Sequence, residues 1–262
     1  MELQIIIVLI MTFIITYIGT LAYAIRIVGV RTGRIAISFS LFNVLILVSR
    51  LASNIQAPLL TKYTEIGSNS SFLSSFYNIL IIGALATIAG AVSIPTFQRV
   101  FSQVVNRFTI SRSVPKILVH GFSKAGIRQF GACITVPKTG HIKHIKLMEL
   151  PLGVMLMNVI AVAVMTVGII APIYSGVLEP TLRATCITLS GAINGVATSI
   201  LYIFVDPYLS VRTDDVIDGK LEESEFRRLV IGMVGSKIVG AAIAIPLLIP
   251  ASRIIVFIAK AL

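Results

Sequence analysis

Two basic residues lie inside long apolar stretches of the sequence, where a charge needs a partner or a purpose. Arg50 lies fifteen residues into the stretch that begins at Ile35, and Lys237 lies eight residues into the one that begins at Leu229. At 1.5 Å per residue these positions are ~22 Å and ~12 Å along two helices. A charge inside a membrane span costs roughly 2.5–3.5 kcal/mol. Because neither stretch holds an acidic partner, these cations could compensate an anionic ligand.

Other polar side chains share a helical face with Arg50. At ~100° per residue, Ser40, Asn43, Arg50 and Asn54 fall within an arc of about 80°. The opposite side is mostly Leu, Ile, Val and Phe. The stripe could line a wet cavity, or it could make hydrogen bonds between helices while Arg50 extends toward the membrane surface. Both alternatives remain open.

A second small and polar face is expected between Arg183 and Val205. Its members are Thr188, Ser190, Gly191, Asn194, Gly195, Thr198 and Ser199. Small residues either let helices approach closely or leave space between them. The matching stripe around Arg50 favours a cavity lined by Ser190, Asn194 and Thr198. Close to Lys237, Gly232, Ser236 and Gly240 instead predict a packing seam.

The elements that must position these residues are membrane-spanning helices. The 262 residues are 56% hydrophobic and 13% charged, whereas soluble domains are roughly 25% charged. Six apolar stretches are long enough to cross a bilayer. They are Leu3–Ile25, Ile35–Leu59, Phe72–Ile94, Leu150–Ile173, Arg183–Val205 and Leu229–Pro250. We therefore expect an all-α polytopic membrane protein with a single integral-membrane domain.

The basic residues predict the orientation of these spans. Lys and Arg gather in the first, third and fifth loops, and the first of these carries Arg26, Arg31 and Arg34. Such loops are usually cytoplasmic, which places both termini outside. The net charge of +11 then needs no nucleic-acid partner. Residues 1–97 and 147–262 would form two three-span halves in opposite orientations, joined by a basic connection at 98–146. Weak internal similarity supports inverted repeats, although chance similarity between apolar segments is an alternative.

The basic connection and an acidic segment are further candidates for a membrane-binding or metal-binding site. The spacing of Phe97, Phe101 and Phe108 predicts an amphipathic helix on the membrane surface, which could serve as an anchor or as a substrate funnel. The histidines near His141 lack the carboxylates or cysteines of a metal site. Residues 214–225 approach a calcium-loop pattern, but Val216 occupies a ligand position. No nucleotide, dinucleotide or metalloprotease motif is present. We therefore expect no metal and no cofactor, and a transport protein rather than an enzyme.

The beginning of the chain supplies a resemblance. The run Ala22-Tyr-Ala-Ile-Arg-Ile-Val-Gly-Val-Arg-Thr-Gly-Arg34, continuing through Asn43 and Arg50 to Gln56-Ala-Pro-Leu-Leu60, resembles the Amj family of alternate lipid II flippases. The likeness extends to the chain length and the number of spans. It implies a bacterial cytoplasmic-membrane protein that moves lipid II, the undecaprenyl-pyrophosphate-linked peptidoglycan precursor, from the inner to the outer leaflet.

The resemblance leads to a hypothesis about roles. Arg26, Arg31 and Arg34 would collect the headgroup at the cytoplasmic mouth, and Arg50 and Lys237 would compensate its charge within the membrane. The expected partners are lipid II and membrane lipids. Two alternative functions stay open: a carrier for another anionic lipid or metabolite, and a membrane scaffold that transports nothing. A second copy of the chain, in a homo-oligomer, is a further possible partner.

Overall fold

The chain is described by a computed structural model that covers residues 2–67, 72–111, 131, 133–135 and 151–262. Within these ranges the elements are helical and there is no strand. In chain order they are α1 (Glu2–Thr32), α2 (Ile35–Ile66), α3 (Phe72–Ser111), α7 (Leu152–Leu178), the 3-10 helix η3 (Pro180–Leu182), α8 (Arg183–Ile200), the π-helix η4 (Leu201–Val205), α9 (Asp206–Ile217) and α10 (Glu223–Ala261). Six helical stretches are long and apolar enough to cross a membrane. The predicted all-α fold with about six spans is confirmed.

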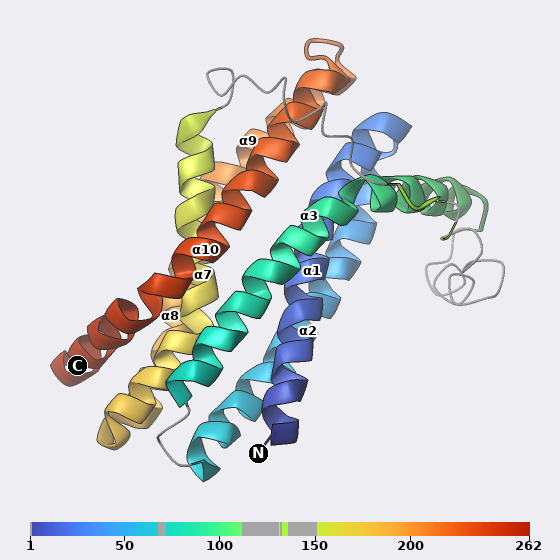
Figure 1. Cartoon of the computed structure of the whole chain (residues 1–262). Helices are drawn as coiled ribbons and strands as arrows, with labels where there is room; N and C mark the ends of the chain where they lie inside the picture. Colours follow the sequence, from blue (N-terminus) through green and yellow to red (C-terminus); the bar gives the residue numbers. More distant parts are fainter. Residues whose placement is uncertain (1, 68–71, 112–130, 132, 136–150) are drawn as a thin grey trace.

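The helices pack in two groups of three (Figure 1). In the first group α1 packs along both α2 and α3, and in the second α7 packs along both α8 and α10. The two groups meet mainly where α10 lies against α3. Both chain ends lie at one end of the bundle, the terminus end, whereas tight turns at Gly33 and Gly219 lie at the other, the turn end. Each central helix therefore has one neighbour in the core and one, α2 or α8, at the periphery.

The first predicted loop proves to be too long. α1 continues past Ile25 to Thr32, so Arg26 and Arg31 belong to a helix rather than to a loop. Nothing between Ile25 and Thr32 breaks a helix, and the chain turns only at Gly33, where φ is +64°. Glycine adopts this left-handed conformation without the steric cost that a Cβ brings. Arg26 is consequently buried inside the protein instead of lying at its mouth.

The fifth loop is also shorter than predicted. α9 reaches Ile217 and α10 begins at Glu223, so that Arg212 and Arg227 are helical. The calcium-like stretch therefore begins with the last turn of α9. In this turn Arg212 pairs with Asp215 and Lys220 pairs with Asp218. The acidic residues thus stabilise the α9–α10 connection through local ion pairs.

The amphipathic helix predicted from Phe97 is the last part of α3 rather than a separate element. Figure 1 shows this part bending away from the bundle axis and projecting sideways near the turn end. We attribute the bend to Pro95, because proline removes a backbone donor and displaces the preceding turn. The ring of Phe97 packs against Tyr17 and Phe101, while Arg99 is exposed. The basic residues from Lys116 to Arg128 and from Lys138 to Lys146 lie outside the described residues.

The small residues of α10 form the predicted packing seam. Gly232, Ser236 and Gly240 are all buried. A Cβ on Gly240 would lie 2.7 Å from the carbonyl oxygen of Val159 and 2.9 Å from the Cβ of Val162. The glycine thus allows the backbones of α7 and α10 to touch.

We expect Gly240→Ala to destabilise the protein by about 1–3 kcal/mol, because the added methyl group forces α7 and α10 apart. The matched control is Gly191→Ala on α8, where a Cβ would meet nothing within 4 Å. Alanine favours a helix over glycine by roughly 0.8–1 kcal/mol, so this control should be neutral or stabilising. Melting in detergent, followed by the loss of the monodisperse gel-filtration peak, measures both. Equal melting temperatures would contradict the close contact at Gly240.

Candidate functional site

The polar stripe on α2 faces outward. Its members Ser40, Asn43, Arg50 and Asn54 are all exposed. The Arg50 guanidinium donates a hydrogen bond of 3.2 Å to the hydroxyl of Tyr202 in η4. A peripheral helix of the first group is thereby linked to a peripheral helix of the second. The stripe makes this side of α2 polar at membrane depth.

The predicted polar residues of α8 are less exposed than those of α2. Ser190, Asn194 and Thr198 are half-buried. The Asn194 amide donates to the carbonyl oxygen of Gly168 in α7 at 3.3 Å, and its own Oδ1 is buried without a hydrogen-bond partner among the described residues. Gly191 and Gly195 face open space instead of another helix. α8 therefore uses Asn194 for packing and leaves its glycines uncovered.

Lys237 extends from α10 toward α1. Its Nζ lies 5.7 Å from the centre of the Tyr23 ring and 3.4 Å from where a Cβ on Gly19 would be. A cation over an aromatic face gains a modest electrostatic attraction. Within the described part of the chain no carboxylate pairs with this ammonium group. Lys237 therefore places a charge at the boundary between the two groups of helices, beside the Tyr23 ring.

A buried polar cluster next to Lys237 was not predicted. Asn158 of α7 is fully buried and donates to Ser236 at 2.6 Å and to the carbonyl oxygen of Met233 at 3.1 Å. Its Oδ1 has no hydrogen-bond partner among the described residues. Asn158 is a single amide in the apolar sequence of α7, so helical spacing offered no signal for it. The cost of burying an amide in a span was the one available clue.

Arg26 is the most buried of the predicted cations. It is 9% exposed, and its Nη2 contacts Oδ1 of Asp206 at 2.5 Å. The guanidinium carbon also lies 5.9 Å and 5.4 Å from the ring centres of Phe39 and Phe42. The sequence showed both charges but not their pairing, because 180 positions separate them.

The remaining predicted cations lie at the turn end. Arg31 contacts Glu223 at 3.3 Å, and the same carboxylate accepts a hydrogen bond from Arg227. Arg34 is exposed and precedes α2. Arg26 and Lys237 come near the same part of α1, since the Lys237 ammonium lies over the ring of Tyr23, three residues before Arg26. Arg50 lies apart on α2, although its partner Tyr202 precedes Asp206 by only four residues. The segment η4–α9 therefore contacts both Arg26 and Arg50.

At the terminus end, two helices are joined by another arginine, which is not among the predicted site residues. Arg183, the first residue of α8, donates to the carbonyl oxygen of Thr61 at 3.3 Å and to the hydroxyl of Thr64. Its aliphatic stem packs on Gly176, where a Cβ would lie 2.8 Å from it. α2 and α8 are therefore tied together at this end, and again at mid-depth by Arg50 and Tyr202.

The terminus end also holds an ion pair that predicts a pH effect. Lys260 contacts Glu179 at 2.5 Å, and Thr181 donates to the same carboxylate at 2.8 Å. These hydrogen bonds, that of Lys260 first, lower the pKa of Glu179 below its ordinary value. Ionised Glu179 therefore stabilises the fold above about pH 4.3, the unfolded pKa, and this contribution is lost as the pH falls through the lowered folded pKa.

We expect the melting temperature of the wild type to exceed that of Glu179→Gln slightly at pH 7, because the pair is solvent-exposed and worth little. The difference should disappear as the pH falls below about 4. Melting curves of both proteins between pH 3 and pH 7 measure it. A difference that stays constant over this range would contradict the ion pair.

These features define the class of protein. A six-span helical bundle, in which guanidinium, ammonium and amide groups lie between and along two helix groups, is a polytopic membrane protein with polar groups at membrane depth. Comparison with known proteins then identifies the family: the model of the Amj family, described as alternate to MurJ, matches residues 11–259. The chain belongs to the Amj family, as its sequence had indicated.

The similarity extends over nearly the whole chain. A relative from Bacillus subtilis (strain 168), named lipid II flippase Amj, is 33% identical over 247 residues, which cover 93% of this chain and 92% of the relative. No solved structure matches the chain. The positions of the charged groups therefore come from the present structure.

Proposed function

We propose that this protein is a lipid II flippase, which moves the undecaprenyl-pyrophosphate-linked precursor from the inner to the outer leaflet of the bacterial cytoplasmic membrane. Membership of the Amj family and the printed name of the Bacillus subtilis relative support this substrate. Flipping moves the headgroup and breaks no covalent bond, so the protein would act as a transporter and not as an enzyme. Its physical task is to shield a pyrophosphate and its sugar-peptide from hydrocarbon.

The observation that carries the proposal is the exposed Arg50 on the polar face of α2. A guanidinium facing lipid at this depth would cost roughly 2.5–3.5 kcal/mol, and its hydrogen bond to the neutral hydroxyl of Tyr202 does not neutralise the charge. The cost disappears if this face meets water or an anionic headgroup. We therefore place the headgroup path along α2, on the side that faces η4 and α8.

The other cations divide the path into steps. Arg31 and Arg34 would collect the headgroup at the turn end. Arg26, Lys237 and Arg50 would compensate its charge at increasing depth from the turn end, and Ser40, Asn43, Asn54, Ser190, Asn194 and Thr198 would hydrogen-bond with it or with water. The polyprenyl tail would stay in the surrounding lipid.

The helix packing supports a mechanism of alternating access. Residues 1–97 and 147–262 would be two inverted halves joined by the basic connection 98–146, with the substrate at their interface, as in many secondary transporters. α1 and α7 are each the central helix of their group, as expected for inverted halves. For each elementary charge that crosses the membrane, the membrane potential would contribute ~2.3 kcal/mol per 100 mV.

Reconstitution tests the proposal directly. Purified protein in liposomes should accelerate leaflet exchange of fluorescent lipid II, scored by the fraction accessible to an external quencher, relative to protein-free vesicles. Undecaprenyl phosphate and an anionic phospholipid serve as alternative substrates. Faster exchange of these alone would identify a carrier for another anionic lipid. No exchange of any of them would indicate a scaffold.

We also propose that the turn end is cytoplasmic and that both termini lie outside, because Arg31 and Arg34 flank the turn at Gly33 and Arg227 lies near the start of α10. In a background with both native cysteines replaced by serine, Leu262→Cys should react with a membrane-impermeant maleimide in intact cells. Lys220→Cys should react only after permeabilisation, since Lys220 lies in the exposed turn after α9. The opposite labelling pattern would reverse the proposed orientation.

A further inference from the structure

One nitrogen of the Arg26 guanidinium is not used in the contact with Asp206. Its Nη2 is engaged by Asp206, but its Nη1 is buried and has no hydrogen-bond partner among the described residues. Leaving a buried donor unsatisfied is costly, and more so when the donor is charged. A guanidinium has parallel donors that match two oxygens of one carboxylate or phosphate. Asp206 contacts it through only one of its oxygens, so the site is incompletely filled.

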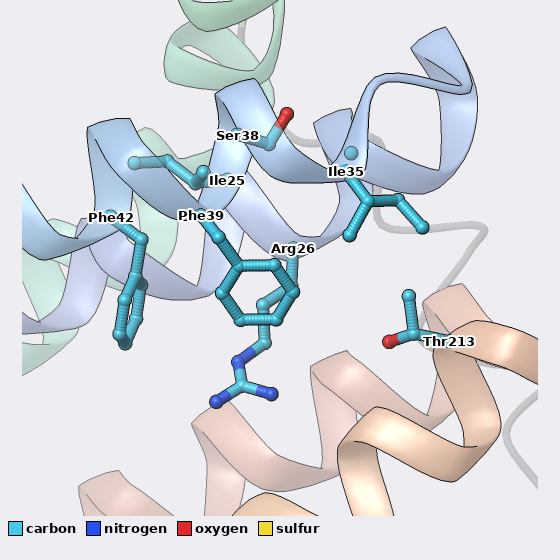
Figure 2. A pocket seen from close by; sticks show the side chains of 8 residues that line it. Ile25, Arg26, Ile35, Ser38, Phe39, Phe42 and Thr213 are labelled. Carbon is cyan, nitrogen blue, oxygen red and sulfur yellow. The ribbon is translucent and has the colours of Figure 1, made fainter.

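The surroundings of Arg26 form a pocket (Figure 2). The side chain extends from α1 beside the rings of Phe39 and Phe42, with Thr213 of α9 across the pocket. The pocket is small and open to the surroundings: its volume of about 10 Å³ accommodates roughly one water molecule, so a larger anion binds only if a neighbouring side chain moves. Apolar walls exclude water and strengthen the attraction of the guanidinium for an anion. The walls come from α1, α2 and α9, so a ligand here would touch both groups of helices.

Asp206 is suited to separate from Arg26. Its side chain is 37% exposed, whereas that of Arg26 is 7% exposed. It is the first residue of α9 and follows the π-helix Leu201–Val205 directly. Single-turn π-helical segments are rare and occur frequently at functional sites. Tyr202, the partner of Arg50, lies in the same π-helix, so a shift of Asp206 would also affect the link between α2 and η4.

We propose that Arg26 is a binding site for the pyrophosphate oxygens of the substrate, and that Asp206 is an internal competitor that occupies Arg26 until the substrate displaces it. Displacement separates α9 from α1 at the turn end and thereby couples substrate binding to movement of the second helix group. This inference rests on the proposed function for its ligand. The geometry identifies an oxyanion, the proposed function makes that anion a pyrophosphate, and the experiment distinguishes a lipid-linked source from a free one.

The test measures binding to the full-length purified chain in detergent. Farnesyl pyrophosphate, inorganic pyrophosphate and farnesol are titrated, and the shift in melting temperature reports their apparent affinities. Asp206→Asn should tighten binding of farnesyl pyrophosphate by roughly tenfold, because the amide competes far less well than a carboxylate for the guanidinium. The matched control Asp218→Asn removes an exposed acid paired with Lys220 and should bind like the wild type. A stronger response to farnesyl pyrophosphate than to inorganic pyrophosphate identifies a lipid-linked ligand, and equal responses identify free pyrophosphate.

A double variant guards against misfolding. Arg26→Gln alone leaves Asp206 unpaired, whereas Arg26→Gln combined with Asp206→Asn removes both charges. The double variant should fold and lose the response to pyrophosphate. Unchanged affinity in Asp206→Asn, or binding by the double variant as tight as by Asp206→Asn, would overturn the proposal.

Leaflet exchange separates this inference from the proposed function. If the wild type exchanges lipid II but Asp206→Asn binds pyrophosphate no more tightly, the Arg26 site is wrong and the flippase proposal stands. If Asp206→Asn binds more tightly but the wild type exchanges no lipid II, the site stands and the flippase proposal is wrong.

Discussion

Arg50→Gln is expected to slow outer-leaflet accumulation of lipid II strongly, without loss of protein from the membrane. The guanidinium is exposed on α2, and within the described ranges its hydrogen bond goes to the exposed Tyr202, so its removal leaves no buried partner there. The headgroup, however, loses a permanent positive charge at membrane depth. If this charge contributes about 2 kcal/mol to the barrier for crossing, the exchange rate falls ~30-fold. Leaflet exchange in liposomes, at equal protein content, measures the effect.

Two controls separate charge from structure at Arg50. Tyr202→Phe removes the hydrogen bond but leaves the arginine, and it should reduce exchange far less than Arg50→Gln. Arg253→Gln removes another exposed arginine, near the end of α10, and should exchange like the wild type. Normal exchange by Arg50→Gln would refute charge compensation on this face of α2 and remove the main structural support for the proposed path.

Lys237→Met is expected to change stability and transport in opposite directions. The ammonium group has the Tyr23 ring beside it and no carboxylate partner in the described part of the chain. Taking such a charge out of water is costly, and methionine has a similar length without the charge. The melting temperature should rise by roughly 2–4 °C, the shift that about 1 kcal/mol produces in a chain of this size. Lipid II exchange should fall by roughly tenfold or more, because the headgroup loses a cation between the two helix groups.

The opposite signs make the Lys237 experiment decisive. A lysine that only supports packing would lower stability and transport together when replaced. Lys220→Met provides the control, because it removes an exposed lysine paired with Asp218 and should change neither quantity appreciably. Normal exchange by Lys237→Met would exclude Lys237 from the path, whatever its melting temperature.

Helix ends and buried contacts were the least predictable features. Arg26 was assigned to a loop, because an arginine after an apolar run normally marks the membrane surface. Its burial depends on Asp206, Phe39 and Phe42, which come from other helices. Asn158 was missed for a related reason, since its partners Met233 and Ser236 lie on α10. Local spacing reports which residues share a helix face but not what lies opposite that face.

Some assignments needed only local information. The polar face around Arg50 follows from helical periodicity alone, and its members are exposed as expected for a face that is not packed against α1. The seam at Gly240 was likewise predictable, because small residues at helical spacing permit close packing. The glycines of α8 show the limit of that rule, since Gly191 and Gly195 face open space instead of a neighbour.

The sequence by itself determined the number of spans, the faces that are polar, and the family, because each depends on runs and periodicities within one segment. Only the tertiary structure decided which charges are paired, which are buried, and that Arg26 and Arg50 meet the same η4–α9 segment. The physical reason is that burial and electrostatic pairing depend on distances between helices, and residues 180 positions apart in the chain, such as Arg26 and Asp206, become neighbours only when those helices pack.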